Sequence, residues 1–331
     1  MGEQVAAPFA GLTPEAILAA VESRGLACDG RVLALNSYEN RVYRIGLLDD
    51  APRVAKFYRP GRWSDAAILE EHDFSAELVA ADLSVLAPLT IAGHTLHHYG
   101  DMRFALFPMQ GGHAPEPGDR DTLRQIGRSL GRLHAVGASD RFQHRATLCV
   151  QGHAIDSLVY LLDAGWLPPS LEENFEALGH LLLDEIEDAW QAAAPIRQLR
   201  LHGDCHPGNI LWREGIAHFV DLDDAMTGPA MQDLWMLCTG DATERSQQLG
   251  WLLDGYELFQ PFDPHELQLI EALRAMRLLH YHAWIARRWH DPAFPAAFPW
   301  FDSPRHWEDV IRQMQEQLSA MREPLLVLDR G

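Results

Sequence analysis

The sequence is poor in cysteine, and its four cysteines, Cys28, Cys149, Cys205 and Cys238, lie far apart without CxxC spacing. This scarcity predicts neither a zinc site nor a disulfide framework, and it fits a reducing compartment. Long apolar runs are missing too, since no segment reaches the roughly 18 consecutive apolar residues of a membrane span. The opening MGEQVAAPFAGLTPEAI has no basic stretch followed by an apolar run, so we expect no signal peptide and a cytoplasmic location.

Positive charge is also scarce, because 27 Lys and Arg residues stand against 47 Asp and Glu residues, for a formal net charge of −20. This balance argues against a general surface for nucleic acid or for an anionic membrane. An anionic substrate would have to be met by cations placed locally. The length of 331 residues leaves room for two domains.

The first third of the chain has the pattern of a small antiparallel sheet with two helices. Thr13 and Pro14 start one helix as N-cap and first helical residue, and Ser64 caps the other. Runs typical of strands lie at 31–35, 41–47, 53–58, 94–99 and 103–108. The stretch 110–119 is rich in Gly and Pro, as expected of a linker, so we predict a domain at 1–110.

The remainder, 111–331, is predicted to be mostly helical, because apolar residues recur at steps of three and four along several stretches. One β-hairpin interrupts this pattern, with strands at Ile210–Trp212 and Ala217–Val220 joined by REG, with Gly215 in the turn. The predicted fold class is therefore α+β, with a small antiparallel-sheet domain followed by a larger helical one.

The segment LHGDCHPGNILWREGIAHFVDLDD, residues 201–224, has the parts of a phosphoryl-transfer site. That reaction needs a carboxylate that orients the acceptor hydroxyl and oxygen ligands that hold Mg²⁺ on the phosphates of ATP. Asp204 and Asn209 have the spacing of the base and the metal-binding Asn of kinases, and Asp221 stands where kinases carry a metal-binding Asp. The predicted hairpin would set Asn209 beside Asp221, at about 5 Å strand spacing.

The segments HGDCHPGN and VDLDDAMTGPAMQDLW resemble the aminoglycoside phosphotransferase and choline kinase-like branch of the kinase superfamily. Over nearly the whole chain, NSYENRVYRIG, VAKFYRPGRWS, ILEEHDF and FPWFD are similar to the bacterial stress response kinase A family of cytoplasmic serine/threonine protein kinases. The resemblance implies a bilobal protein kinase-like fold, with 1–110 as the nucleotide-binding lobe and 111–331 as the catalytic and substrate lobe.

The resemblance also implies a role for each matching residue. Asp204 would accept the proton, and Asn209 and Asp221 would hold Mg²⁺, which makes Asp204 and Asp221 the catalytic pair. Ser37 would lie at the ATP-binding loop, and Lys56 would contact the α- and β-phosphates.

Two further contacts are expected around the nucleotide. Lys56 would pair with Glu71, since Phe74 and Leu78 then follow on the same helix, although the adjacent Glu70 stays open as an alternative. The backbone at Met109, at the domain boundary, is expected to meet the adenine ring.

The polar residues that flank the motif have structural as well as functional interpretations. Asp223 either binds metal or caps the following segment, and Asp233, at the start of a helical stretch, is interpreted as structural support. His202 is interpreted as holding the catalytic loop. Zinc is disfavoured because no H-E-x-x-H pattern appears among the histidines.

The sequence departs from protein kinases in two places. The nucleotide loop NSYENRV contains no glycine, and only 12 positions separate Asp221 from Asp233, which leaves no room for a long activation segment. We therefore expect an enzyme that is constitutively assembled or is governed by its expression.

The sequence is compatible with three functions. The resemblance favours a monomeric stress-response protein kinase that phosphorylates Ser or Thr on other proteins or on itself. A small-molecule kinase for an amino alcohol, sugar or antibiotic would use the same catalytic core. A non-catalytic nucleotide-binding module is disfavoured, because the base, the metal ligands and the lysine are all present.

Overall fold

The computed structural model describes residues 8–328, which form two compact units. The N-terminal unit consists of the chain up to Pro115 together with Phe142–Arg145 and His206–Ala225, and the helical unit consists of the rest. This division differs from the sequence-based boundary at 110, and it gives the predicted hairpin to the N-terminal unit.

The N-terminal unit is built on a five-stranded antiparallel sheet with the order β1-β2-β3-β5-β4. Its elements are α1 (Pro14–Glu22), β1 (Cys28–Ala34), β2 (Arg41–Leu47), β3 (Arg53–Phe57), α2 (Asp65–Ala80), β4 (His97–Tyr99), β5 (Met102–Pro108) and the hairpin strands β7 (Ile210–Arg213) and β8 (Ile216–Phe219). Each strand lies within three residues of its predicted start.

Both helices of this unit begin where their capping residues predict. The side chain of Thr13 accepts a hydrogen bond from the backbone N–H of Ala16, and that of Ser64 accepts one from Ala67. Such bonds satisfy N–H groups that have no partner within the helix.

The two faces of the sheet pack against different helices. Ala55 and Phe57 of β3 belong to the core cluster that includes Ile17 and Val21 of α1. Side chains alternate along a strand, so Lys56 points to the opposite face. On that face, Ala105 of β5 packs with Ile68 of α2.

The β7–β8 hairpin closes with a two-residue turn, Glu214–Gly215, whose φ angles of 54° and 76° fit a type I′ turn. The predicted hairpin is thus confirmed, with a turn one residue shorter than REG. The hairpin joins the N-terminal unit through backbone hydrogen bonds, from Leu86 N–H to the Phe219 carbonyl and from Trp212 N–H to the His113 carbonyl. Such long-range pairing cannot be read from local sequence.

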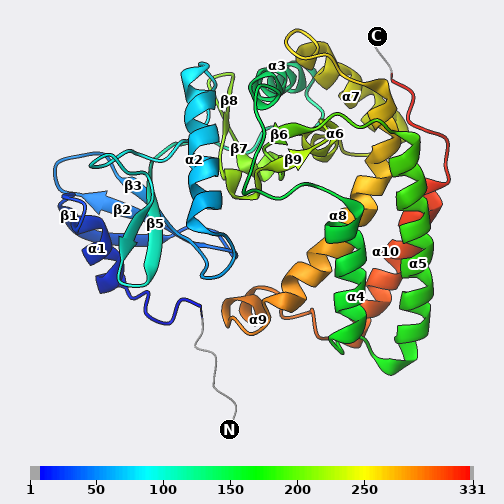
Figure 1. The fold of residues 1–331 in the computed structure, drawn as a ribbon, viewed down its shortest axis with the longest axis horizontal. Helices are drawn as coiled ribbons and strands as arrows, with labels where there is room; N and C mark the ends of the chain where they lie inside the picture. The colour runs from blue at the N-terminus through cyan, green and yellow to red at the C-terminus, as the bar shows by residue number, and fades with distance from the viewer. Residues whose placement is uncertain (1–7, 329–331) are drawn as a thin grey trace. The chain divides into compact units, whose positions relative to one another are not determined.

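The helical unit contains most of the helices and one short two-stranded sheet, in which β6 pairs antiparallel with β9. Its elements are α3 (Arg120–Gly137), α4 (Asp156–Asp163), α5 (Pro169–Ala192), β6 (Leu199–Leu201), β9 (Met226–Gly228), α6 (Met231–Leu234), α7 (Ala242–Tyr256), α8 (Leu269–Arg287), α9 (Ala293–Ala297) and α10 (Pro304–Met321). Helices α4, α5 and α10 all pack against α8 (Figure 1). The predicted α+β class is confirmed.

Helices α3 and α7 approach so closely that a side chain would not fit between them. A β-carbon at Gly127 would overlap the carbonyl oxygen of Leu252, and one at Gly131 would overlap that of Tyr256. None of the helices within 8–328 is both long and apolar enough to cross a membrane.

Candidate active site

Lys56 is the only lysine in the chain, and the structure places it at the centre of a buried acidic cluster. Its Nζ atom lies 2.8 Å from Oδ1 of Asp221 and 3.1 Å from Oδ1 of Asp223. Burial by itself would lower the pKa of Lys56, but the carboxylates of Asp221, Asp223 and Glu71 outweigh it and hold that pKa above its usual value. Lys56 is therefore a permanent cation in this cluster.

Glu71 and Glu70, adjacent on α2, have different environments. Glu71 is 2% exposed and acts electrostatically on Lys56, although no ion pair between them is formed within 4 Å. Burial raises the pKa of Glu71 to about 7, and the charge of Lys56 opposes this shift. Glu70 instead accepts backbone hydrogen bonds from residues 143–145. The lysine-facing acid of α2 is thus Glu71.

Asp223 is enclosed by cations and one amide. Its Oδ2 atom accepts a 3.0 Å hydrogen bond from Asn40 Nδ2 and contacts the guanidinium of Arg62, which also reaches Asp224. Burial would raise the pKa of Asp223, but Arg62 and Lys56 hold it well below its usual range. Neither Asn40 nor Arg62 was among the predicted site residues.

Asp221 ends the hairpin in a backbone conformation that few residues adopt. Its φ of 58° and ψ of 64° are left-handed, a region that costs energy for residues other than glycine and that is found often at functional sites. The N–H of Val220 donates a 3.0 Å hydrogen bond to the carbonyl of Asn209, so Asn209 and Asp221 lie at neighbouring hairpin ends. The side chain of Asp221 is 50% exposed, and it can therefore take a further ligand.

Two more predicted nucleotide contacts, Ser37 and Met109, belong to this unit. Ser37 lies in the turn between β1 and β2, where its hydroxyl donates a 3.2 Å hydrogen bond to the carbonyl of Asn40. Met109 directly follows β5 and is exposed.

In the helical unit, Asp204 follows β6 and meets an arginine from α8. Arg277 Nη1 donates a 2.7 Å hydrogen bond to Asp204 Oδ1, and the side chains are 44% and 23% exposed, respectively. Asp204 and Asn209 belong to different units but are joined by continuous chain. Sequence reasoning missed Arg277, which lies 73 positions away.

The loop before Asp204 is clamped by Asp233, which is fully buried at the start of α6. Its two carboxylate oxygens accept hydrogen bonds of 2.8 Å from the backbone N–H groups of His202 and Gly203, and Oδ2 also bonds His134 Nε2 at 3.0 Å. Asp233 therefore holds the backbone of this loop at His202 and Gly203, and the role of the His202 side chain stays a prediction.

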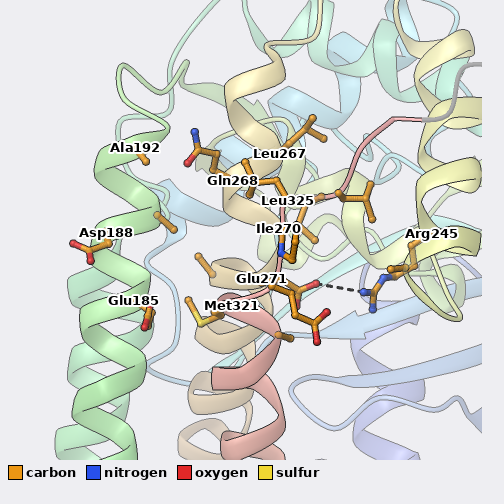
Figure 2. A pocket seen from close by; sticks show the side chains of 17 residues that line it. Glu185, Asp188, Ala192, Arg245, Leu267, Gln268, Ile270, Glu271, Met321 and Leu325 are labelled. Atoms are coloured by element: carbon orange, nitrogen blue, oxygen red, sulfur yellow. Dashed lines mark ion pairs between the residues drawn. The ribbon is translucent and has the colours of Figure 1, made fainter.

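A cavity of about 260 Å³ lies elsewhere in the helical unit, between α5, α7, α8 and the chain that follows α10 (Figure 2). Arg245 faces Glu271 across it at 3.6 Å. None of the predicted site residues lines this cavity.

Residues 8–328 contain no cluster of three His, Cys, Asp or Glu side chains placed to hold a metal by themselves. Mg²⁺ usually keeps several waters and binds one or two carboxylates together with substrate phosphates. An amide oxygen at Asn209 and a half-exposed carboxylate at Asp221 suit that mode. The donor set fits magnesium.

Comparison with known proteins identifies the family. A family model described as "Phosphotransferase enzyme family" matches residues 31–270. Stress response kinase A of Escherichia coli K12 is 43% identical over 97% of each chain, and the serine/threonine protein kinase RdoA of Salmonella typhimurium matches equally well. The chain belongs to the stress response kinase A family of phosphotransferases. The predicted resemblance is confirmed, and the chain is a phosphotransferase.

Solved structures of other kinases have the same fold at low identity. An amicoumacin kinase in complex with AMP-PNP and Ca²⁺ has a TM-score of 0.72 and 15% identity, with 95% of this chain and 96% of that chain covered. A microcompartment-associated aminopropanol kinase has a TM-score of 0.69 and 17% identity, with 92% and 98% covered. These neighbours confirm the predicted kinase-like fold.

Proposed function

We propose that this family member is an ATP- and Mg²⁺-dependent serine/threonine protein kinase. The observation that carries the proposal is the 2.8 Å ion pair between Lys56 and Asp221, the latter at the hairpin end beside Asn209. A buried ammonium next to a half-exposed carboxylate and an amide is the donor set that a magnesium nucleotide requires.

The identity of Lys56 supports a phosphate-binding role. Lys56 is one of 27 Lys and Arg residues in the chain, and all the others are arginines. An ammonium is a compact point charge that can meet two phosphates at once, whereas a guanidinium is a planar fork. Lys56 would contact the α- and β-phosphates, with Glu71 as the acid that faces it once Asp221 engages the metal.

The remaining roles follow from the chemistry of phosphoryl transfer. Asn209 and Asp221 would hold Mg²⁺, which would neutralise charge on the phosphates. Asp204 would orient the acceptor hydroxyl and take its proton as the hydroxyl oxygen bonds to the γ-phosphorus and the bond to the β-phosphate oxygen breaks. ADP and a phosphate ester would be the products. Ser37 and Met109 would line the nucleotide at the loop and at the adenine edge.

The protein acceptor is supported by relatives that cover almost the whole chain. One of them, at 43% identity, is named a serine/threonine protein kinase, whereas the amicoumacin kinase and the aminopropanol kinase are only 15% and 17% identical. We further propose that the protein acts in stress response, as the names of the relatives suggest. We also propose that it is a cytoplasmic monomer. In this proposal Asp223 holds Lys56 in place. Asp233 and His202 maintain the shape of the loop before Asp204.

The test is to incubate the protein with γ-labelled ATP and Mg²⁺ in three sets of reactions. The first contains no other acceptor, the second contains generic protein acceptors, and the third contains choline, aminopropanol or aminoglycosides. We expect acid-stable label on protein, resolved as phosphoserine or phosphothreonine and absent in Asp204→Asn. Efficient labelling of a small alcohol without labelling of protein would refute the protein acceptor and would leave the phosphotransferase assignment standing.

A further inference from the structure

We propose that the partly exposed face of α8 that begins at Arg277 is the docking surface for the acceptor segment, and that it selects segments rich in Asp and Glu. This inference rests on the proposed protein kinase function and names the class of its substrate. The surface consists of Arg277, Tyr281, Trp284, Arg287 and Arg288, and is called the α8 face below.

Helical spacing places four of these five residues together. Arg277, Tyr281, Trp284 and Arg288 follow one another at steps of four, three and four, so they line one side of the helix, and Arg287 lies at its border. The opposite side is buried, at Leu279, Ala283 and Ala286. The rings of Tyr281 and Trp284 are stacked, with centroids 6.0 Å apart and planes at 22°.

The α8 face starts at the proposed base. Arg277 Nη1 bonds Asp204 Oδ1 at 2.7 Å, which fixes one end of the stripe at the point of proton transfer. The eleven residue-to-residue steps from Arg277 to Arg288 span about 16 Å of helix axis. An extended peptide of about five residues covers the same distance. An acceptor hydroxyl at Asp204 would therefore place its neighbours in sequence along this face.

The charge of the α8 face is opposite to that of the whole protein. Residues 269–288 carry four arginines and one carboxylate, Glu271, in a chain with a net charge of −20. Arg287 donates a 3.0 Å hydrogen bond to the carbonyl oxygen of Asp156 and lies over the ring of Tyr160. Within residues 8–328 it forms no ion pair with a carboxylate, so its charge can meet a ligand.

The pKa of His280 reflects the positive potential around these arginines. Burial lowers this pKa most, and together with the charges of His153, Arg287, Arg288 and Arg277 it brings the pKa to about 3. The three arginines therefore act on one point of α8. Carboxylates complement such a surface, whereas the cationic amino groups of aminoglycosides and amino alcohols would be repelled. Exposed Tyr281 adds an aromatic platform on which a peptide can pack.

Three peptides test the proposal, each with one serine and flanked by Asp and Glu, by neutral residues, or by Lys and Arg. We expect the highest kcat/KM for the acidic peptide, with an advantage that shrinks as salt is added. In the double variant Arg287→Gln/Arg288→Gln, KM for the acidic peptide should rise about tenfold, since each exposed pair contributes up to about 1 kcal/mol.

Two control variants separate charge from structure. Arg287→Lys/Arg288→Lys keeps the charge while it changes the contacts with Asp156 and Tyr160, and it should keep the preference for the acidic peptide. Arg312→Gln removes a charge from α10, which lies outside the α8 face, and should leave all three peptides as in the wild type.

Equal kcat/KM for the three peptides, or a preference for the basic peptide, would overturn the proposed docking surface. Phosphorylation of any of the peptides would still support the kinase function. A dimer that the double Gln variant abolishes would also overturn it, because a second copy would then cover the α8 face. If small alcohols are phosphorylated and no peptide is, the kinase function itself fails.

Discussion

Arg277 and Asp204 are joined by a 2.7 Å hydrogen bond, so the proposed proton acceptor is held by a cation from α8. The bond occupies Oδ1 and thereby fixes the orientation of the whole carboxylate. Arg277 is thus a positioning residue for the transfer step.

Replacement of Arg277 should reduce turnover more than nucleotide binding. We expect Arg277→Ala to lower kcat by about tenfold to a hundredfold with little change in KM for ATP, because the base loses its orientation. Arg277→Lys should restore part of the lost kcat. A normal kcat in Arg277→Ala would contradict the assignment.

Asp221 and Asp204 should differ in what their loss does to nucleotide affinity. Asp221→Ala should abolish Mg²⁺-dependent ATP binding and activity, while Asp204→Asn should bind ATP normally and lose transfer. Calorimetry with ATP, with and without Mg²⁺, measures this directly. Because Lys56 is the only lysine, an amine-reactive label on its peptide gives a second readout, and Mg²⁺ and ATP should protect it in Asp204→Asn. Failure of Asp204→Asn to bind ATP would show that the two roles are misassigned.

Arg62 should be important for stability, although it lies outside the predicted chemistry. Its guanidinium contacts Asp223, which is 3% exposed, so removal leaves a buried carboxylate with less compensation. We expect Arg62→Ala to destabilise the fold by about 3 kcal/mol. Arg312→Ala, which breaks exposed pairs on α10, is the matched control and should cost about 0.5 kcal/mol. Urea denaturation compares the two, and equal losses would refute the role of Arg62.

Glu266 should give stability a measurable pH dependence. It is 2% exposed, it accepts a 2.8 Å hydrogen bond from the N–H of Met231, and burial raises its pKa from 4.5 to about 7. As pH rises through this interval the unfolded chain loses this proton first, so the native state is progressively destabilised.

The variant Glu266→Gln keeps an acceptor for Met231 and removes the titration. Relative to the wild type, its free energy of unfolding should gain about 3 kcal/mol between about pH 4.5 and about pH 7.5. Urea denaturation at several pH values measures the difference. A difference that stays constant over this range would show that Glu266 does not titrate as described.

The parts of the site that sequence could predict are those encoded locally. The β3 strand around Lys56 follows from its apolar alternation, and the hairpin that brings Asn209 next to Asp221 follows from two short strands around a glycine turn. Resemblance added the family, which the comparisons confirm. The roles assigned to individual residues remain predictions.

The contacts that escaped prediction join residues far apart in the chain. Arg62 meets Asp223 across 161 positions, and Arg277 meets Asp204 across 73. No spacing rule encodes such pairs. The choice between Glu70 and Glu71 also needed burial, because both acids suit the same helix. One signal was available and unused, namely that Lys56 is the single lysine in the sequence.

The order in which the segments of the N-terminal unit are translated affects when that unit can fold. Lys56 and Arg62 emerge from the ribosome early, while the carboxylates that neutralise them, at 221–224, are translated about half a chain later. Until then the nascent N-terminal unit would have to bury two cations with only the partial counter-charge of Glu71 and Glu39, which is unfavourable. The sheet should therefore mature late, and a fragment that stops at Pro115 should not reach the native arrangement.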